Sequence, residues 1–141
     1  MKSSNAFTMI ELIFVIIILG ILASVALPKF AGVRNQADIA NAKAQVATIQ
    51  TAIVNKRQRK LILGVTEWIV PGDEAGEMNE GGLFKGVLTQ ALNNENSVGN
   101  WYTADPDNGI YTFILSDEVV TFTYEDTNGT FQCTNNCTKF D

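Results

Sequence analysis

The amino-acid sequence predicts an α+β fold in which a long, kinked N-terminal helix packs on a small antiparallel β-meander head. Three observations predict it. Residues 7–27 are almost entirely apolar, residues 29–61 repeat apolar side chains at helical spacing, and residues 110–133 hold three short stretches rich in β-branched and aromatic side chains. The 141 residues are enough for one such domain with an N-terminal extension.

The first element is the apolar run that follows the polar leader MKSSNA. If helical, residues 7–27 are about 31 Å long at ~1.5 Å per residue, which matches the ~30 Å hydrocarbon core of a bilayer. Glu11 lies near the start of this run, and no ionisable residue occurs from Leu12 to Leu27. The length therefore favours one membrane-spanning helix over a buried helix of a soluble protein.

Pro28 separates this run from the next helical segment. A proline in the first turn starts a new helix, whereas one in the interior kinks a continuous helix. We favour the second arrangement, a single kinked helix from Phe7 to about Leu61. The cationic run 56–60 suits the C-terminal end of such a helix, which stops by Gly64.

The second half of the predicted helix, residues 29–61, is amphipathic. Its apolar side chains are mostly small, so we expect them to pack closely on a flat surface such as a sheet or on neighbouring helices. They form two adjacent rows, the first with Phe30, Val33, Ala37, Ala40, Ala44, Ala47, Thr51 and Val54, the second with Ile39, Ala42, Val46, Ile49 and Ile53.

The head follows over residues 62–141. Residues 70–82 indicate an acidic loop whose carboxylates, Asp73, Glu74, Glu77 and Glu80, face solvent. Helical spacing of Leu83, Val87, Leu88, Ala91 and Leu92 predicts a short helix over 83–94. A three-stranded antiparallel meander is expected over 110–115, 119–124 and 130–133, with turns at 116–118 and 125–129.

Composition excludes several kinds of site. The sequence has no His, which removes the commonest general base and metal ligand, and Cys133 and Cys137 alone cannot complete a zinc site. No nucleophile–base pair or phosphate loop is present, so we expect no enzyme. Basic residues concentrate in 1–60 and acidic residues in 61–141, which indicates complementary surfaces rather than a nucleic-acid module with one basic face.

The motif K-x-x-x-A-FTMIEL, followed by ILGILASVALP, resembles the N-terminus of type IV pilins and of the related pseudopilins of type II secretion systems. In that family a prepilin peptidase cleaves after a small residue, usually Gly, and methylates the new N-terminal amine. The resemblance, which covers residues 2–30, implies cleavage between Ala6 and Phe7 and N-methylation of Phe7. Ala6 stands where Gly is usual, and its similar size should allow processing.

Glu11 becomes the fifth residue of the mature chain under this resemblance. A carboxylate in hydrocarbon costs roughly 2.5 to 3.5 kcal/mol on insertion scales. Leader removal creates a cationic amine at Phe7, and in a filament of staggered helices a neighbour's amine can meet Glu11 in an apolar core. Glu11 would then set the register of assembly. The alternative is an interfacial Glu that marks the end of the spanning helix.

The resemblance also assigns roles to Gly20 and Pro28, which would lie where family helices lose hydrogen bonds in assembled filaments. Gly weakens a helix by up to ~1 kcal/mol relative to Ala, and Pro removes a hydrogen bond. Close helix packing at Gly20 and a simple bend at Pro28 explain the same residues equally well.

Cys133 and Cys137 enclose the short loop CTNNC. The resemblance implies an oxidising periplasm and a C-terminal disulfide, as many pilins have, although often with a longer loop. A loop this short contributes about 2 kcal/mol. Free thiols are the alternative.

Two charged segments have competing interpretations. Asp105 and Asp107 in DPDNG are candidate calcium ligands, since major pseudopilins can bind calcium, but a turn before the strand at 110–115 explains them without a metal; we expect no cofactor. The run KRQRK could contact DNA as in some pilins. We instead expect Arg57 and Lys60 to face the acidic head of another subunit, with no nucleic-acid partner.

Together these features predict a structural subunit of a type IV pilus-like filament, favouring a pseudopilin of a type II secretion system over a pilus subunit for adhesion, motility or DNA uptake. The expected partners are copies of the chain, the prepilin peptidase, an inner-membrane assembly platform, minor pilins or pseudopilins, and the lipid bilayer. We expect a single pass in the inner membrane with the head in the periplasm, then a periplasmic or surface filament. The predicted segments are a leader (1–6), a transmembrane and fibre-core helix (7–28), an amphipathic helix (29–61) and the head (62–141).

Outside this family, the alternatives are a secreted binding domain and a single-pass anchored protein. The sequence SVA before Leu27 has Ser24 and Ala26 at the positions that a secretory signal peptidase prefers. The single Lys of the leader, the long apolar run and Glu11 within it argue against that cleavage.

Overall fold

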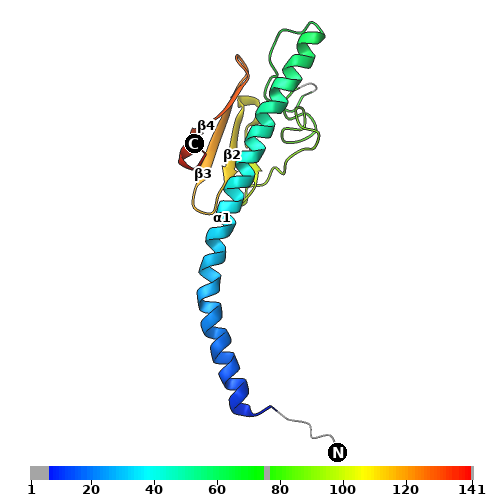
Figure 1. Cartoon of the computed structure of the whole chain (residues 1–141). Helices are drawn as coiled ribbons and strands as arrows, with labels where there is room; N and C mark the ends of the chain where they lie inside the picture. Colours follow the sequence, from blue (N-terminus) through cyan, green and yellow to red (C-terminus); the bar gives the residue numbers. More distant parts are fainter. Residues whose placement is uncertain (1–6, 75–76, 141) are drawn as a thin grey trace, which may run out of the picture. The chain divides into compact units, whose positions relative to one another are not determined.

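The computed structural model describes residues 7–74 and 77–140, without the side chains of residues 27, 28, 30 and 31. They belong to two compact units, residues 1–36 and 37–141. The expected leader, with Ala6, lies outside the described residues. In order, the elements are α1 (Met9–Ile62), β1 (Trp101–Tyr102), the 3-10 helix η1 (Pro106–Asn108), β2 (Ile110–Ile114), β3 (Val119–Glu125), β4 (Thr130–Asn135) and the 3-10 helix η2 (Cys137–Lys139) (Figure 1).

Helix α1 is one continuous helix of 54 residues that passes through Gly20 and Pro28. This confirms the single long helix predicted from sequence. It ends in a hydrogen-bonded turn in which Gly64, with φ of 81°, donates to the Leu61 carbonyl and Val65 donates to the Lys60 carbonyl. This is the Schellman arrangement, and it requires the left-handed backbone that Gly adopts without strain.

The sheet is antiparallel, in the order β1-β2-β3-β4. The three strands predicted from sequence are confirmed as β2, β3 and β4. Strand β1 was not predicted, because it has only two residues and forms by pairing Trp101 with Phe113 and Tyr102 with Thr112. The β3–β4 register shifts between Thr121 and Phe122, next to the C-terminal end of β4.

The core of the second unit lies between the sheet and residues 37–62 of α1, beside which the strands are drawn in Figure 1. Of the two rows of apolar side chains on the helix, the second is the buried one: Ala42, Ile49 and Ile53 have no exposed surface. The first row is exposed from Ala37 to Val54. The core residues are Ala42, Ile49, Ile53, Ile69, Met78, Leu83, Phe84, Val87, Trp101, Tyr111, Phe113, Leu115, Val120, Phe122, Tyr124 and Phe131.

The helix predicted over 83–94 is absent; these residues form turns and bends with a single β-bridge residue, Asn94. A side-chain contact favours the turns. The side chain of buried Asn79 accepts a hydrogen bond from the Phe84 backbone N–H, and Phe84 adopts a positive φ of 57° that an α-helix excludes. The Asn79 side chain is held in place by the core, because it also donates to Tyr111 Oη at 2.9 Å. The apolar side chains that suggested a helix are still buried or half-buried, but from consecutive turns.

Candidate functional site

The N-terminal end of α1 carries a capping arrangement. Thr8 precedes the first helical residue, and its Oγ1 accepts a hydrogen bond from the Glu11 backbone N–H at 3.3 Å, while its carbonyl accepts from Glu11 and Leu12. Thr followed three residues later by Glu is the spacing of a capping box. Thr8 was not among the predicted site residues, although the Thr-x-x-Glu spacing is visible in the sequence.

Glu11 therefore has a local role besides the one predicted for assembly. It lies in the first turn of α1, where its carboxylate faces the positive end of the helix dipole, an interaction worth about 0.3–1 kcal/mol at an exposed site. Phe7 lies just before the helix with 74% of its surface exposed, and Glu11 is exposed as well. Both groups of the predicted ion pair are thus accessible to another molecule.

The apolar half of α1 makes no core in this chain. Met9–Ala26 is long and apolar enough to cross a membrane by length and composition, with a mean hydropathy of 2.8, and none of it is buried. The hydroxyl of Ser24 donates to the Ile21 carbonyl at 2.7 Å, so this polar side chain is satisfied within the helix. A helix with satisfied polar groups and an apolar surface is suited to hydrocarbon or to an apolar bundle.

Gly20 lies in the middle of that half. A methyl group built on its α-carbon would contact no atom within 4 Å in the described part of the chain. Within one subunit, therefore, no close approach requires a glycine at this position. The helical backbone also continues through Pro28. The predicted loss of hydrogen bonds at these two residues concerns an assembled state and stays a prediction.

The sequence model of the prokaryotic N-terminal methylation motif matches residues 1–27, the segment that contains Phe7 and Glu11. The chain carries this methylation motif. A curated relative, the type IV narrow pilus major component PilA5 of Thermus thermophilus, is 43% identical over 49 residues, which cover 35% of this chain and 42% of the relative. The match thus spans less than half the length of that relative. No solved structure matches the chain.

The resemblance to type IV pilins is confirmed by these two matches, and the α+β layout of the chain is pilin-like. The match to the methylation motif, residues 1–27, includes the whole apolar segment Met9–Ala26. The candidate functional site is therefore the whole N-terminal segment, with Phe7, Thr8 and Glu11 at its beginning.

The cationic run at the far end of α1 is largely engaged within the subunit. The Lys56 Nζ donates to the Gly86 carbonyl at 2.9 Å, the Arg57 guanidinium donates to the Glu67 carbonyl at 2.8 Å, and the Lys60 Nζ donates to the Trp68 carbonyl at 2.8 Å. The Arg57 guanidinium also lies 4.8 Å from the Trp68 ring centroid. Arg57 and Lys60, expected to face another subunit, instead hold the loop that follows α1.

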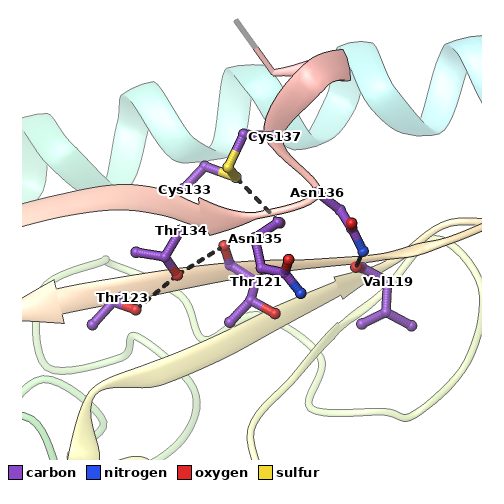
Figure 2. The surroundings of a disulfide bond; sticks show 8 residues. All are labelled: Val119, Thr121, Thr123, Cys133, Thr134, Asn135, Asn136 and Cys137. Atoms are coloured by element: carbon purple, nitrogen blue, oxygen red, sulfur yellow. Dashed lines mark hydrogen bonds between the residues drawn. A yellow bond between two sulfur atoms is a disulfide. The ribbon is translucent and has the colours of Figure 1, made fainter.

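The predicted disulfide between Cys133 and Cys137 is present, with the two α-carbons 5.7 Å apart. Figure 2 shows it beside Asn136, whose backbone is left-handed and whose side chain donates to the Val119 carbonyl at 2.8 Å. It joins β4 to η2. The residues that follow contact the sheet and its β2–β3 turn. The Phe140 ring packs edge-on against Phe122 with centroids 5.1 Å apart, and the Lys139 ammonium pairs with Asp117 at 2.5 Å and Glu118 at 2.9 Å.

These contacts fasten the C-terminal segment to the β2–β3 turn. Hydrogen bonds from Lys139 to Asp117 and Glu118 raise the pKa of the Lys139 ammonium above its usual value. Because this side chain is at the surface, the pairs contribute more to the position of η2 than to the stability of the head.

The candidate calcium ligands lie at η1. Asp105 precedes this 3-10 helix and accepts a hydrogen bond from the Asn108 side chain, as expected for a turn. Asp107 points toward Gly72, where a methyl group would lie 3.0 Å from its Oδ1 and 2.0 Å from Glu77 Oε2. Among the described residues, no group of three or more Asp, Glu, His or Cys side chains is arranged to hold a metal ion.

Proposed function

We propose that this chain is a structural subunit of a type IV pilus-like filament, processed between Ala6 and Phe7 and polymerised through α1. The observation that carries the proposal is the exposed apolar half of α1 under the methylation motif: Met9–Ala26 contains no buried residue and carries Glu11 as its one carboxylate. Such a surface needs a partner outside the chain. A bilayer covers it before assembly, and helices of other copies cover it in the filament.

The chemistry of the site supports this sequence of states. Before cleavage the Phe7 nitrogen belongs to a neutral peptide bond, and Glu11 has the helix N-terminus as its favourable environment. Cleavage makes that nitrogen an amine that is cationic when protonated. A buried ion pair is stable only when both charges are present, so the amine of one copy and the carboxylate of another define one register in an apolar core.

The proposed setting is an inner membrane with the head in the periplasm. The Cys133–Cys137 disulfide supports an oxidising compartment for the head. The prepilin peptidase and an inner-membrane assembly platform are the proposed partners that process the chain and extract it from the bilayer, and minor pilins or pseudopilins are proposed co-subunits.

Two kinds of filament fit this proposal. The relative named as a pilus major component favours a surface pilus subunit, which we adopt as the leading form. The small head with its five-residue cysteine loop, from Cys133 to Cys137, favours the second candidate, a pseudopilin of a type II secretion system. Electron microscopy of cells lacking the gene distinguishes them: loss of surface fibres supports the pilus, and intact fibres with retained secretion substrates support the pseudopilus.

Mass spectrometry of the mature protein tests the proposal itself. The expected N-terminus is N-methylated Phe7. A mature protein that starts at Leu27 would identify a secreted domain, and one that starts at Met1 would identify a simple anchored protein. Either result would overturn the filament proposal.

A further inference from the structure

A groove runs along the second half of α1, on the flank that faces residues 87–90. It consists of two adjoining hollows of about 680 and 410 Å³ that share Arg59, Val87, Leu88 and Thr89. The first hollow is bounded on the helix side by residues of the 47–55 stretch. The second continues past Arg59 to Leu63, a side chain that is 79% exposed. Together they are large enough to receive the tip of a loop.

The groove is cationic at one end. The charged residues that line it are Lys56, Arg59 and Lys60, and no carboxylate lines either hollow. The ammonium groups of Lys56 and Lys60 are bonded to the Gly86 and Trp68 carbonyls, so they point into the subunit. The exposed guanidinium of Arg59 makes no hydrogen bond or ion pair with the described residues. It is thus the donor that the groove offers to another molecule.

The head also presents an exposed acidic turn. Glu125 and Asp126 are adjacent and exposed at the β3–β4 turn, and neither carboxylate forms a hydrogen bond or ion pair within the described residues. Asp117 and Glu118 are already engaged by Lys139, and Asp105 by Asn108. Asp73 and Glu74 are exposed as well, but the residues that follow them, 75 and 76, lie outside the described part of the chain. The β3–β4 turn is therefore the exposed acidic pair whose flanking backbone is described on both sides, and we take it as the candidate for an external cation.

This turn is closed by a hydrogen bond from the Gly129 N–H to the Glu125 carbonyl at 2.8 Å and packs against Trp68. Gly129, at its end, has a φ of 73°, and a methyl group on it would lie 2.2 Å from the Trp68 ring. Trp68 in turn lies against the Arg57 guanidinium. The turn is thus anchored through Trp68 to the flank of α1 that carries Arg57. A preorganised projection loses little entropy when it docks.

The groove and the turn cannot meet within one subunit. Successive residues of an α-helix are about 100° apart, so Arg57 and Arg59 lie about 160° apart around α1. Arg57 faces Trp68 and the β3–β4 turn, whereas Arg59 faces residues 87–89. Gln50, on the side of Arg57, donates to the Phe131 carbonyl of β4, which places the sheet edge on that flank as well. The cationic groove and the acidic turn therefore belong to opposite flanks of the helix.

We propose that the groove at Arg59 receives the Glu125–Asp126 turn of a second copy of this chain. Different surfaces of two identical subunits then meet, which is a heterologous contact, and heterologous contacts that do not close generate open helical assemblies. Arg59 pairs with the two carboxylates, and Val87 and Leu88 contact the turn. The inference deepens the proposed function, on which it rests, by naming a contact between heads that is separate from the Phe7–Glu11 contact between helices.

Charge substitutions in the full-length chain test this contact. Arg59→Glu is expected to reduce sedimentable filaments about tenfold, because an attraction becomes a repulsion at every interface. Adding Glu125→Lys and Asp126→Lys to the same chain restores the opposite charges and should restore assembly. Arg59→Gln and Gln58→Glu form a matched pair, since each lowers the net charge by one and Gln58 is exposed outside the groove. Only Arg59→Gln should weaken assembly.

Cross-linking tests the contact between Arg59 and the β3–β4 turn independently of filament formation. In membranes containing the processed chain, Arg59→Cys with Asp126→Cys should give a ladder of disulfide-linked multimers, and each single variant should not. A wild-type chain that forms no filament would overturn the proposed function, while the ladder would still support the contact. Equal assembly of Arg59→Gln and Gln58→Glu, with no ladder, would overturn the contact in a chain that does form filaments. Cross-linking only to other proteins would assign the groove to another partner.

Discussion

The two halves of helix α1 share one continuous backbone but meet different surroundings. In residues 9–26 the apolar side chains surround the helix, and none of this segment is buried. In residues 37–62 they concentrate on one side, where Ile49 and Ile53 are fully buried. The periodicity of apolar residues therefore tells where the partner of a helix lies. An amphipathic helix packs on its own domain, and a helix that is apolar all round needs an environment outside it.

The largest effect is expected from Glu11→Ala in the first half. Removing this carboxylate leaves the neighbour's Phe7 amine buried and unpaired, at a cost of about 3–5 kcal/mol per contact. We expect a processed, membrane-inserted subunit that forms no filaments, measured by sedimentation and electron microscopy. Glu11→Gln should fail similarly, and Ile10→Ala is the control that should assemble. Normal filaments from Glu11→Ala would refute the register role.

The next prediction contrasts one buried and one exposed isoleucine. Ile53→Ala should destabilise the head by about 2–5 kcal/mol, because it opens a cavity against the sheet. Ile17→Ala, at a residue 55% exposed in the structure, should leave the unfolding of the head unchanged. Denaturant unfolding of the full chain in detergent, followed by near-ultraviolet circular dichroism of its aromatic side chains, measures both. Similar losses from the two variants would contradict the division of α1 into two functions.

A third prediction concerns alkaline pH, which should act on the head. Burial raises the pKa of Tyr111 from 10.0 to about 12, although the hydrogen bond from Asn79 lowers it in part. The unfolded chain then loses this proton near its ordinary pKa while the folded head retains it. The contribution of Tyr111 to the free energy of unfolding is therefore fully present below about pH 10. It falls by about 1.4 kcal/mol per pH unit between about pH 10 and pH 12.

Urea unfolding at pH 8, 10 and 11.5 measures this loss. Tyr111→Phe should flatten the alkaline dependence without removing it, since burial and the nearby charge of Asp126 also raise the pKa of Tyr124. A slope in Tyr111→Phe as steep as in the wild type would exclude Tyr111 as a source of alkaline sensitivity.

The smallest effect is expected at the helix cap. Thr8→Ala removes the hydrogen bond to the Glu11 N–H, at a cost of about 1 kcal/mol. Amide hydrogen exchange of the first turn should accelerate about fivefold, whereas Thr8→Ser should preserve protection. Filament assembly should persist. If Thr8→Ala abolished assembly as Glu11→Ala does, Glu11 would act through the cap instead of through an ion pair.

Most secondary structure was predictable because it follows local patterns. The unbroken helix, the strands β2–β4 and the Cys133–Cys137 pair all agree with the sequence analysis. The candidate site at Phe7 and Glu11 was also visible in the sequence, because the motif is contiguous. What local patterns could not show was the engagement of Arg57 and Lys60, since their acceptors are carbonyls of a loop whose path depends on the fold.

The sequence by itself determined the extent of the long helix, which part of that helix is suited to a membrane, and where a carboxylate interrupts the apolar run. These are properties of residue type and spacing along one chain. Tertiary structure decided that 83–94 is not a helix, because Asn79 captures the Phe84 N–H, and that two residues at 101–102 become a strand. It also decided that Arg59, rather than its cationic neighbours, faces outward. Each of these outcomes depends on contacts that only the folded chain brings together, such as the hydrogen bond from the Asn79 side chain to Tyr111 Oη and the pairing of β1 with β2.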